Sequence, residues 1–128
     1  MTEHKQKFHA SFLKNSKFGS GSLRGYFMDR DLGMTEATGG MVFAEVHRAN
    51  GAPPEGGSGT HYHTVDFQMN YLLKGWMKVE IEGEGEITFE AGDAWLQPPK
   101  INHNVLGFSE DLEVLEICMP ANFGTEEA

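Results

Sequence analysis

Three histidines have the residue type and the spacing that could hold a metal ion. His61 and His63 are separated by one residue, so on a β-strand both side chains point to the same face, about 7 Å apart along the chain. His103 comes much later and follows Pro98 and Pro99, which form a rigid bend leading into a different strand. Metal ligands must be fixed by separate rigid elements, and imidazole nitrogens bind transition metals at about 2 Å. The pattern therefore predicts a metal site formed by His61, His63 and His103.

Gln68 is the candidate for a fourth position at this site. It lies five residues after His63, and on one straight strand that odd offset would place it on the opposite face. Residues 64–66 can form a turn that starts a new strand and brings Gln68 back inward. Strand alternation then turns Asn70 and Leu72 inward as well, which makes both of them candidate pocket residues.

Short apolar segments separated by Gly, Pro, Asn and Asp predict an all-β domain. Residues 76–82 alternate cleanly, with Met77, Val79 and Ile81 on one face and charged residues on the other. Because no stretch combines a sustained helical period with capping residues, little helix is expected. Strands at this even spacing form a sandwich or a closed barrel. We expect them at residues 41–47, 67–73, 76–82, 86–89, 94–97, 104–108 and 112–119.

The segment around the first two histidines resembles the first conserved motif of the cupin superfamily. That motif places two histidines as H-x-H, then a glutamate, then a glycine, at fixed spacing. In this chain His61, His63 and Gly75 stand at three of these positions, and Gln68 stands where the family has the glutamate.

Residues 92–107 look like the second motif of the same superfamily, in which a glycine, a proline and a histidine follow one another at fixed spacing. Gly92, Pro98 and His103 match that spacing. Lys100 replaces a usual glycine and Gly107 a usual asparagine, and both departures concern the shape of a turn. The chain thus resembles a small single-domain bacterial cupin. The resemblance implies a double-stranded β-helix, or jelly-roll, barrel that holds one metal ion.

The glutamine changes the chemistry that the resemblance implies. With three neutral imidazoles and a neutral amide as ligands, a divalent ion keeps its full charge, which makes it a stronger Lewis acid and favours anionic substrates. Imidazoles suit Fe, Ni, Mn, Co or Zn in the divalent state. An amide is a weaker ligand than a carboxylate, so Gln68 either binds the metal directly or holds a bound water. Because Gln68 is no base, proton abstraction would need Asp66, His47, Glu116 or a metal-bound hydroxide.

His47 and Glu116 are the remaining candidate pocket residues. His47 shares strand parity with Glu45 and belongs to neither motif. Glu116 has the opposite parity to Leu115, and it is either exposed or the buried acid that some cupins place near the metal. Their proximity to the site is therefore an open hypothesis.

Three functions fit these features. The first is a metal-dependent enzyme that acts on a small oxygenated molecule, either as a dioxygenase or as an isomerase, lyase or cyclase. The second is a non-catalytic module that binds or senses a small ligand, and the third is a barrel that the metal merely stabilises. Fold alone does not decide between them. We take the enzyme as the working hypothesis.

Length, charge and cysteine content limit the class of protein. The 128 residues fit one domain, with an N-terminal arm at residues 1–22, the barrel at 23–122 and a tail at 123–128. The net charge of -9 argues against binding to nucleic acid or to anionic lipid. Cys118 is the single cysteine; it lies in an apolar run and is expected to be buried and inert. Without the apolar core of a signal peptide or a stretch long enough to span a membrane, the protein is expected to be cytoplasmic.

The outer face of the predicted barrel indicates a homodimer. A small-molecule ligand is expected as a further partner. If Gln68 points inward, Phe67, Met69 and Tyr71 form an apolar row on the outside of the barrel that needs cover. The lysine-rich N-terminal arm is interpreted as a solvated, frayed segment, with a weak contact to the acidic body of a partner subunit as the alternative. In many cupins the N-terminal strand packs against a second subunit, so the resemblance implies a homodimer as well.

Overall fold

A computed structural model describes residues 5–19 and 25–127. Within these residues the regular secondary structure is almost entirely β-strand, with one short α-helix, α1 (Met34–Ala37), and one 3-10 turn, η1 (Leu13–Asn15). The strands are β1 (Phe27–Asp31), β2 (Phe43–Ala49), β3 (His61–Thr64), β4 (Phe67–Lys74), β5 (Trp76–Ile81), β6 (Gly85–Glu90), β7 (Ala94–Leu96), β8 (His103–Phe108), β9 (Glu113–Met119) and β10 (Gly124–Glu127). In this described part no helix has the length and hydropathy of a membrane span.

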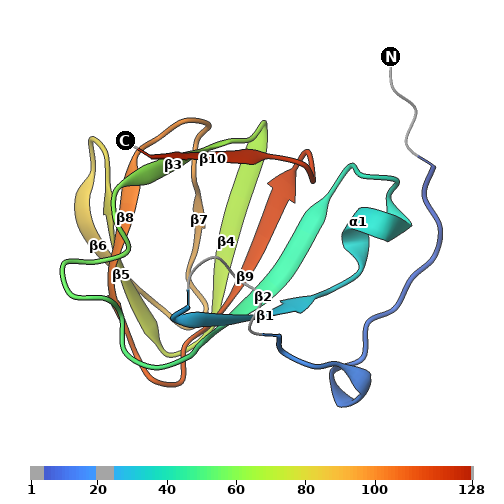
Figure 1. Ribbon diagram of the computed structural model, residues 1–128, viewed down its shortest axis with the longest axis horizontal. Coiled ribbons are helices and arrows are strands. Elements are labelled where there is room, and N and C mark those ends of the chain that lie inside the picture. Colours follow the sequence, from blue (N-terminus) through green and yellow to red (C-terminus); the bar gives the residue numbers. More distant parts are fainter. Residues whose placement is uncertain (1–4, 20–24, 128) are drawn as a thin grey trace.

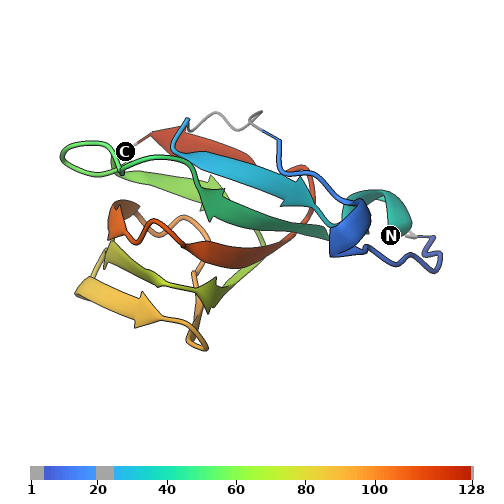
Figure 2. The ribbon, with the colours of Figure 1, turned by 90° about the horizontal axis from the view of Figure 1, so that it is seen from below.

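The strands form two antiparallel sheets that face each other. One sheet has the order β1-β2-β9-β4-β7 and the other has the order β10-β3-β8-β5-β6. Figure 1 shows the sheets curving around a common interior, and Figure 2 shows them as two layers. Strands that are distant in sequence, such as β2 and β9, pair within one sheet. The predicted jelly-roll barrel is therefore confirmed.

The core follows from the alternation that the sequence shows most clearly in β5. Met77, Val79 and Ile81 point inward and are 2–7% exposed. They pack with Leu72 and other apolar residues of both sheets into one cluster. Burial of a side chain of this size contributes roughly 1.5–3 kcal/mol. The apolar cluster therefore holds the two sheets together, and the polar site residues project from these sheets.

Gly75 and Lys100 are motif positions that occupy turns with positive φ. Gly75, between β4 and β5, has φ 77°, and a Cβ there would collide with Ser109 and Asp111. Lys100 has φ 61° and is the one non-glycine residue with positive φ in the described ranges. It stands where the second motif usually has a glycine, so its departure from the motif is a matter of turn shape, as expected. Its amide N–H donates to the carbonyl of His63 at 3.1 Å and thereby ties the loop before β8 to β3.

The two ends of the chain are more closely attached to the barrel than the sequence suggested. In the region expected to be a tail, β10 pairs with β3 in antiparallel register. In the expected arm, Gly19 forms a β-bridge with Asp29, and Ser11 accepts a 2.8 Å hydrogen bond from Arg30. Hydrogen bonding of a sheet edge explains both attachments, because edge strands leave backbone groups that need partners. Figure 1 shows that residues 5–18 run outside the barrel.

Candidate metal centre

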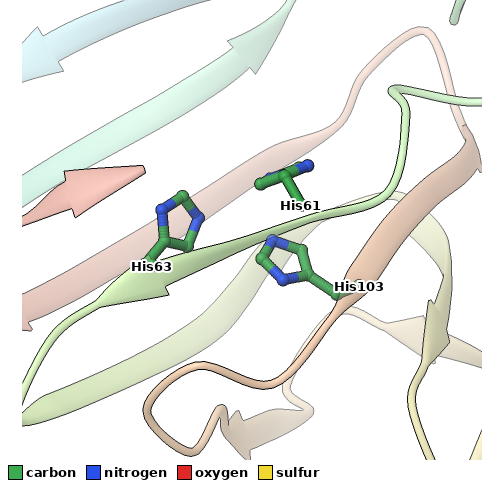
Figure 3. A group of neighbouring side chains, drawn as sticks. All are labelled: His61, His63 and His103. Carbon is green, nitrogen blue, oxygen red and sulfur yellow. The ribbon is translucent and has the colours of Figure 1, made fainter. Parts of the chain in front are cut away.

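The three histidines converge because two neighbouring strands present them to the same space. His61 and His63 lie on β3, and His61 is directly opposite His103 of β8 in the antiparallel register. One nitrogen from each ring lies within 4.8 Å of the others. Figure 3 shows the rings grouped together, two from β3 and one from β8. This spacing suits a single ion bonded to three nitrogens at about 2 Å.

Backbone carbonyls orient two of the rings. The Nδ1 atom of His61 donates to the carbonyl of Gly59 at 2.8 Å. Nδ1 of His103 lies 3.3 Å from the carbonyl of Ile101. In His61 the proton that Nδ1 donates leaves the lone pair of the ring on Nε2, which is the arrangement typical of metal-binding histidines. His61 and His103 are both buried, so these orientations are held in a protected environment.

Gln68 reaches the same region from β4. As the sequence indicated, β3 ends at Thr64 and β4 begins at Phe67, and this change of strand turns Gln68 inward. Its side chain is 3% exposed. Its Nε2 donates to Glu116 Oε2 at 2.6 Å, and its Oε1 accepts from Gln97 Nε2 at 3.3 Å. Gln97 Nε2 is also 3.1 Å from Nδ1 of His103, so the amide of Gln68 adjoins the histidines through Gln97.

His47 lies between two carboxylates beside this group. Its Nδ1 is 2.6 Å from Asp29 Oδ1, and its Nε2 is 2.7 Å from Glu116 Oε1. Burial alone would lower the pKa of His47, but the hydrogen bonds and charges of Asp29 and Glu116 outweigh burial and raise it to about 10. His47 is therefore a cation at neutral pH. Burial opposes ionisation of Glu116, yet His47 holds the pKa of that carboxyl below its ordinary value.

These groups line a cavity of about 450 Å³, which is the size of a small-ligand pocket. Of the candidate pocket residues, Asn70, His47 and Glu116 line it, whereas Leu72 is fully buried in the apolar cluster. The other lining residues are mostly apolar or aromatic, and they include Tyr26, Phe27, Phe43, Val79, Trp95 and Phe123. The cavity lining therefore combines polar site residues with apolar and aromatic side chains.

Glu45 is a cavity carboxylate that the sequence analysis did not select. Burial raises its pKa to about 7; the His47 cation lowers it, and the charges of Asp29, Asp31 and Glu116 raise it. Together Asp29, Glu45 and Glu116 place three carboxyl groups in the cavity beside His47.

Asp29 and Gln97 were also missed. Gln97 is 4% exposed and contacts both Gln68 and His103. Its strand parity with Trp95 was the available signal, because a large aromatic residue on a short strand is expected to face inward. Asp29 lies in β1 among other charged residues, and the sequence contains no motif that singles it out. Asp66, a candidate base, is exposed and is not among the residues lining the cavity.

Comparison with protein families gives one match that covers just over half of the chain. A family model described as a cupin domain matches residues 51–118, a range that contains all three histidines and Gln68. No curated protein matches the sequence significantly.

Solved structures of similar fold have low sequence identity. The polyketide cyclase RemF from Streptomyces resistomycificus has a TM-score of 0.74 at 16% identity, with 95% of this chain and 86% of that chain covered. KdgF from Halomonas sp. has a TM-score of 0.68 at 18% identity, with 88% and 94% covered. Oxalate decarboxylase from Bacillus subtilis, whose structure concerns Mn(II) centres, has a TM-score of 0.60 at 15% identity, with 79% and 28% covered. At these identities the similarity shows the fold.

Proposed function

Because the chain belongs to the cupin domain family, we propose that it is a metal-dependent enzyme acting on a small oxygenated molecule. In this proposal His61, His63, His103 and Gln68 hold one divalent transition metal ion. The observation that carries the proposal is the convergence of three imidazole nitrogens within 4.8 Å of one another at the wall of a ligand-sized cavity. When bound, the ion would act as a Lewis acid on a substrate oxygen.

The protein's own groups favour proton transfer as the accompanying chemistry. Both nitrogens of His47 and both oxygens of Glu116 are engaged in hydrogen bonds. Glu45 lines the cavity, and no hydrogen bond engages its carboxylate within the described part of the chain. Its raised pKa, about 7, suits a group that takes up and returns a proton near neutral pH. We therefore assign proton transfer to Glu45 and place the reaction among isomerisations, eliminations and cyclisations.

The cavity also limits the substrate class. The aromatic and aliphatic side chains of the lining suit a hydrophobic portion of the substrate, and its carboxyl groups suit hydroxyl groups that donate hydrogen bonds. A neutral hydroxy-ketone or phenolic ketone has both features. The polyketide cyclase among the proteins of similar fold shows that a barrel of this shape can serve an enzyme.

Deuterium incorporation tests this proposal most directly. Protein loaded with Ni²⁺, Co²⁺, Zn²⁺, Mn²⁺ or Fe²⁺ would be incubated in D₂O with a panel of hydroxy-ketones and phenolic ketones, and exchange beside the carbonyl followed by NMR. We expect exchange that requires the metal and is lost in His61→Ala and Glu45→Gln. The exposed Glu84→Gln is the matched control and should keep it. Metal-dependent oxygen uptake without exchange would instead support the dioxygenase alternative, and saturable binding without either would support a binding module.

We also propose that the protein is a homodimer. On the outer face of the β4 sheet Tyr71 and Leu96 are 38% and 62% exposed. In the N-terminal segment Phe8, Phe12 and Leu13 are 93%, 58% and 61% exposed. This segment is also rich in lysine, whereas the chain as a whole has a net charge of -9. A second copy offers the acidic surface and the apolar face that such a segment would cover.

A further inference from the structure

A continuous chain of hydrogen bonds fixes the orientation of the Gln68 amide. The chain begins at the indole of Trp95, whose Nε1 donates to Gln97 Oε1 at 3.4 Å. Gln97 Nε2 then donates to Gln68 Oε1 at 3.3 Å. Gln68 Nε2 donates to Glu116 Oε2 at 2.6 Å, and His47 holds the other oxygen of that carboxylate. The chain of hydrogen bonds thus begins with a donor, the indole N–H of Trp95, and ends with an acceptor, the carboxylate of Glu116.

Both ends of this chain have a fixed hydrogen-bonding sense. An indole N–H can only donate, and an ionised carboxylate can only accept. The indole of Trp95 therefore fixes the position of Gln97 Oε1, and the carboxylate of Glu116 fixes the position of Gln68 Nε2. The two constraints agree, because the Gln97 nitrogen then meets the Gln68 oxygen. Rotating the Gln68 amide by half a turn would place an oxygen against Glu116 and a nitrogen against Gln97, which are two mismatched contacts.

We propose that Glu116 is a positioning residue that holds the Gln68 amide with its oxygen toward the histidines. This inference rests on the proposed function, since it concerns how Gln68 is presented to the metal. A carbonyl oxygen has two lone pairs, so Gln68 Oε1 can accept from Gln97 and still serve as a ligand. The family motif has a carboxylate at position 68. In this chain the carboxylate belongs to Glu116, which reaches the proposed metal position through the Gln68 amide. Through the amide, Glu116 restores negative charge to a ligand set that is otherwise neutral.

Glu116→Gln tests the inference, because it keeps the shape of the side chain and removes its acceptor-only character. With its oxygen retained by His47, the amide introduced at position 116 would present N–H groups to Gln68 and turn the Gln68 amide over. An amide nitrogen that donates is no metal ligand. Loss of such an outer partner typically weakens metal binding by about 10–100-fold. Cobalt affinity, measured by competition with a chelator, should fall by that factor.

The matched control is Glu113→Gln, the same change on the same strand. Glu113 forms ion pairs with Arg48 and Lys74 and does not line the cavity. The cobalt affinity of this variant should stay within about twofold of wild type. If Glu116→Gln also stays within about twofold while His61→Ala loses binding, the inference is wrong and the metal site stands. Wild-type protein that binds no cobalt would overturn the proposed function and the inference with it.

Exchange of the two side chains gives a sharper test than either single change. In Gln68→Glu with Glu116→Gln the donor and acceptor trade places, and the net charge equals that of wild type. The amide introduced at position 116 would then donate to the carboxylate introduced at position 68, and we expect cobalt affinity at least as high as in wild type. Gln68→Glu alone sets two carboxylates against each other, so without metal it should be less stable than the double variant. A double variant that binds cobalt no better than Glu116→Gln would contradict the inference.

The orientation of Gln68 also has a readout that needs no metal. In ¹H–¹⁵N spectra of the metal-free protein, the side-chain NH₂ signals of Gln68 are identified by their loss in Gln68→Glu. A short hydrogen bond to a carboxylate should move one of these protons downfield, and Glu116→Gln should reverse the shift. An unshifted pair in wild type would overturn the assigned orientation. Should Glu116→Gln not fold, Glu116→Asp, which draws the carboxylate back by one methylene, should give the same reversal.

Discussion

At the scale of the residue, Glu45 links stability to pH. Its pKa is raised from 4.5 to about 7 in the folded protein, chiefly by burial, so its ionisation costs free energy in the folded state alone. The protonated carboxyl of Glu45 therefore contributes to the free energy of unfolding, fully so below pH 4.5. This contribution is lost as the pH rises through 7. Glu45→Gln should therefore raise the melting temperature at about pH 8 and change it little at about pH 5. Glu84→Gln, a change at an exposed position, should leave the melting temperature unaltered at both pH values. An equal rise in the melting temperature of Glu45→Gln at both pH values would contradict the role assigned to burial.

His47 makes an independent prediction at the same scale. Removing this cation leaves Asp29 and Glu116 as carboxylates without their shared partner. Breaking a buried ion pair from one side typically costs about 3–5 kcal/mol. Urea unfolding at neutral pH should therefore show His47→Asn to be about 3 kcal/mol less stable than wild type. The difference should shrink as pH rises through about 10, the raised pKa of His47. A variant as stable as wild type at neutral pH would refute the cationic role.

Single residues also show how far a sequence predicts a site. The i and i+2 spacing places His61 and His63 on one face of a strand whatever the surrounding fold, because that follows from backbone geometry alone. Asp29 and Glu45 could not be found in this way. Their relevance comes from β1 and β2 lying next to β9 in one sheet, which is a long-range pairing that no local pattern encodes. The same pairing decides that Glu116 is a cavity residue and not a surface one.

At the scale of the element, the turn at Lys100 stores strain that a glycine would release. A non-glycine residue in the left-handed region costs roughly 1–2 kcal/mol. Glycine also raises the conformational entropy of the unfolded chain, which lowers stability by roughly 0.5–1 kcal/mol. Lys100→Gly should thus stabilise the protein by about 0.5–1 kcal/mol, measured by chemical denaturation. Lys100→Ala keeps the Cβ and should bring no gain; an equal gain from alanine would show that the side chain, and not the backbone, is responsible.

Elements with strong alternation were predictable, and elements that depend on a partner were not. β5 alternates over its whole length, so both its position and its inward face followed from the sequence. β10 has the sequence GTEE, which shows no alternation and has little intrinsic tendency to form a strand. It is a strand because the edge of β3 supplies its hydrogen bonds. Such an element exists only through tertiary pairing, and local propensity cannot reveal it.

At the scale of the whole molecule, the outer face of the β4 sheet predicts the oligomeric state. Met69, which points outward from β4, lies opposite Leu96 of β7 and Ile117 of β9, so the apolar face extends across three strands. Light scattering coupled to size exclusion should give about twice the chain mass of 14.2 kDa. Leu96→Glu should yield a folded monomer, because a carboxylate buried in this interface would lack a partner. Thr88→Glu, exposed on the other sheet, should leave the dimer intact. A wild-type monomer would refute the proposed interface.

Metal stoichiometry tests the central claim most directly. Protein stripped of metal, reconstituted with Co²⁺ and freed of excess ion would be subjected to elemental analysis, beside His61→Ala and His103→Ala prepared identically. We expect one ion per chain in the wild-type protein and loss of that ion in both variants, because the three imidazoles converge on a single position. Wild-type protein without stoichiometric metal, or variants that retain the ion, would contradict it.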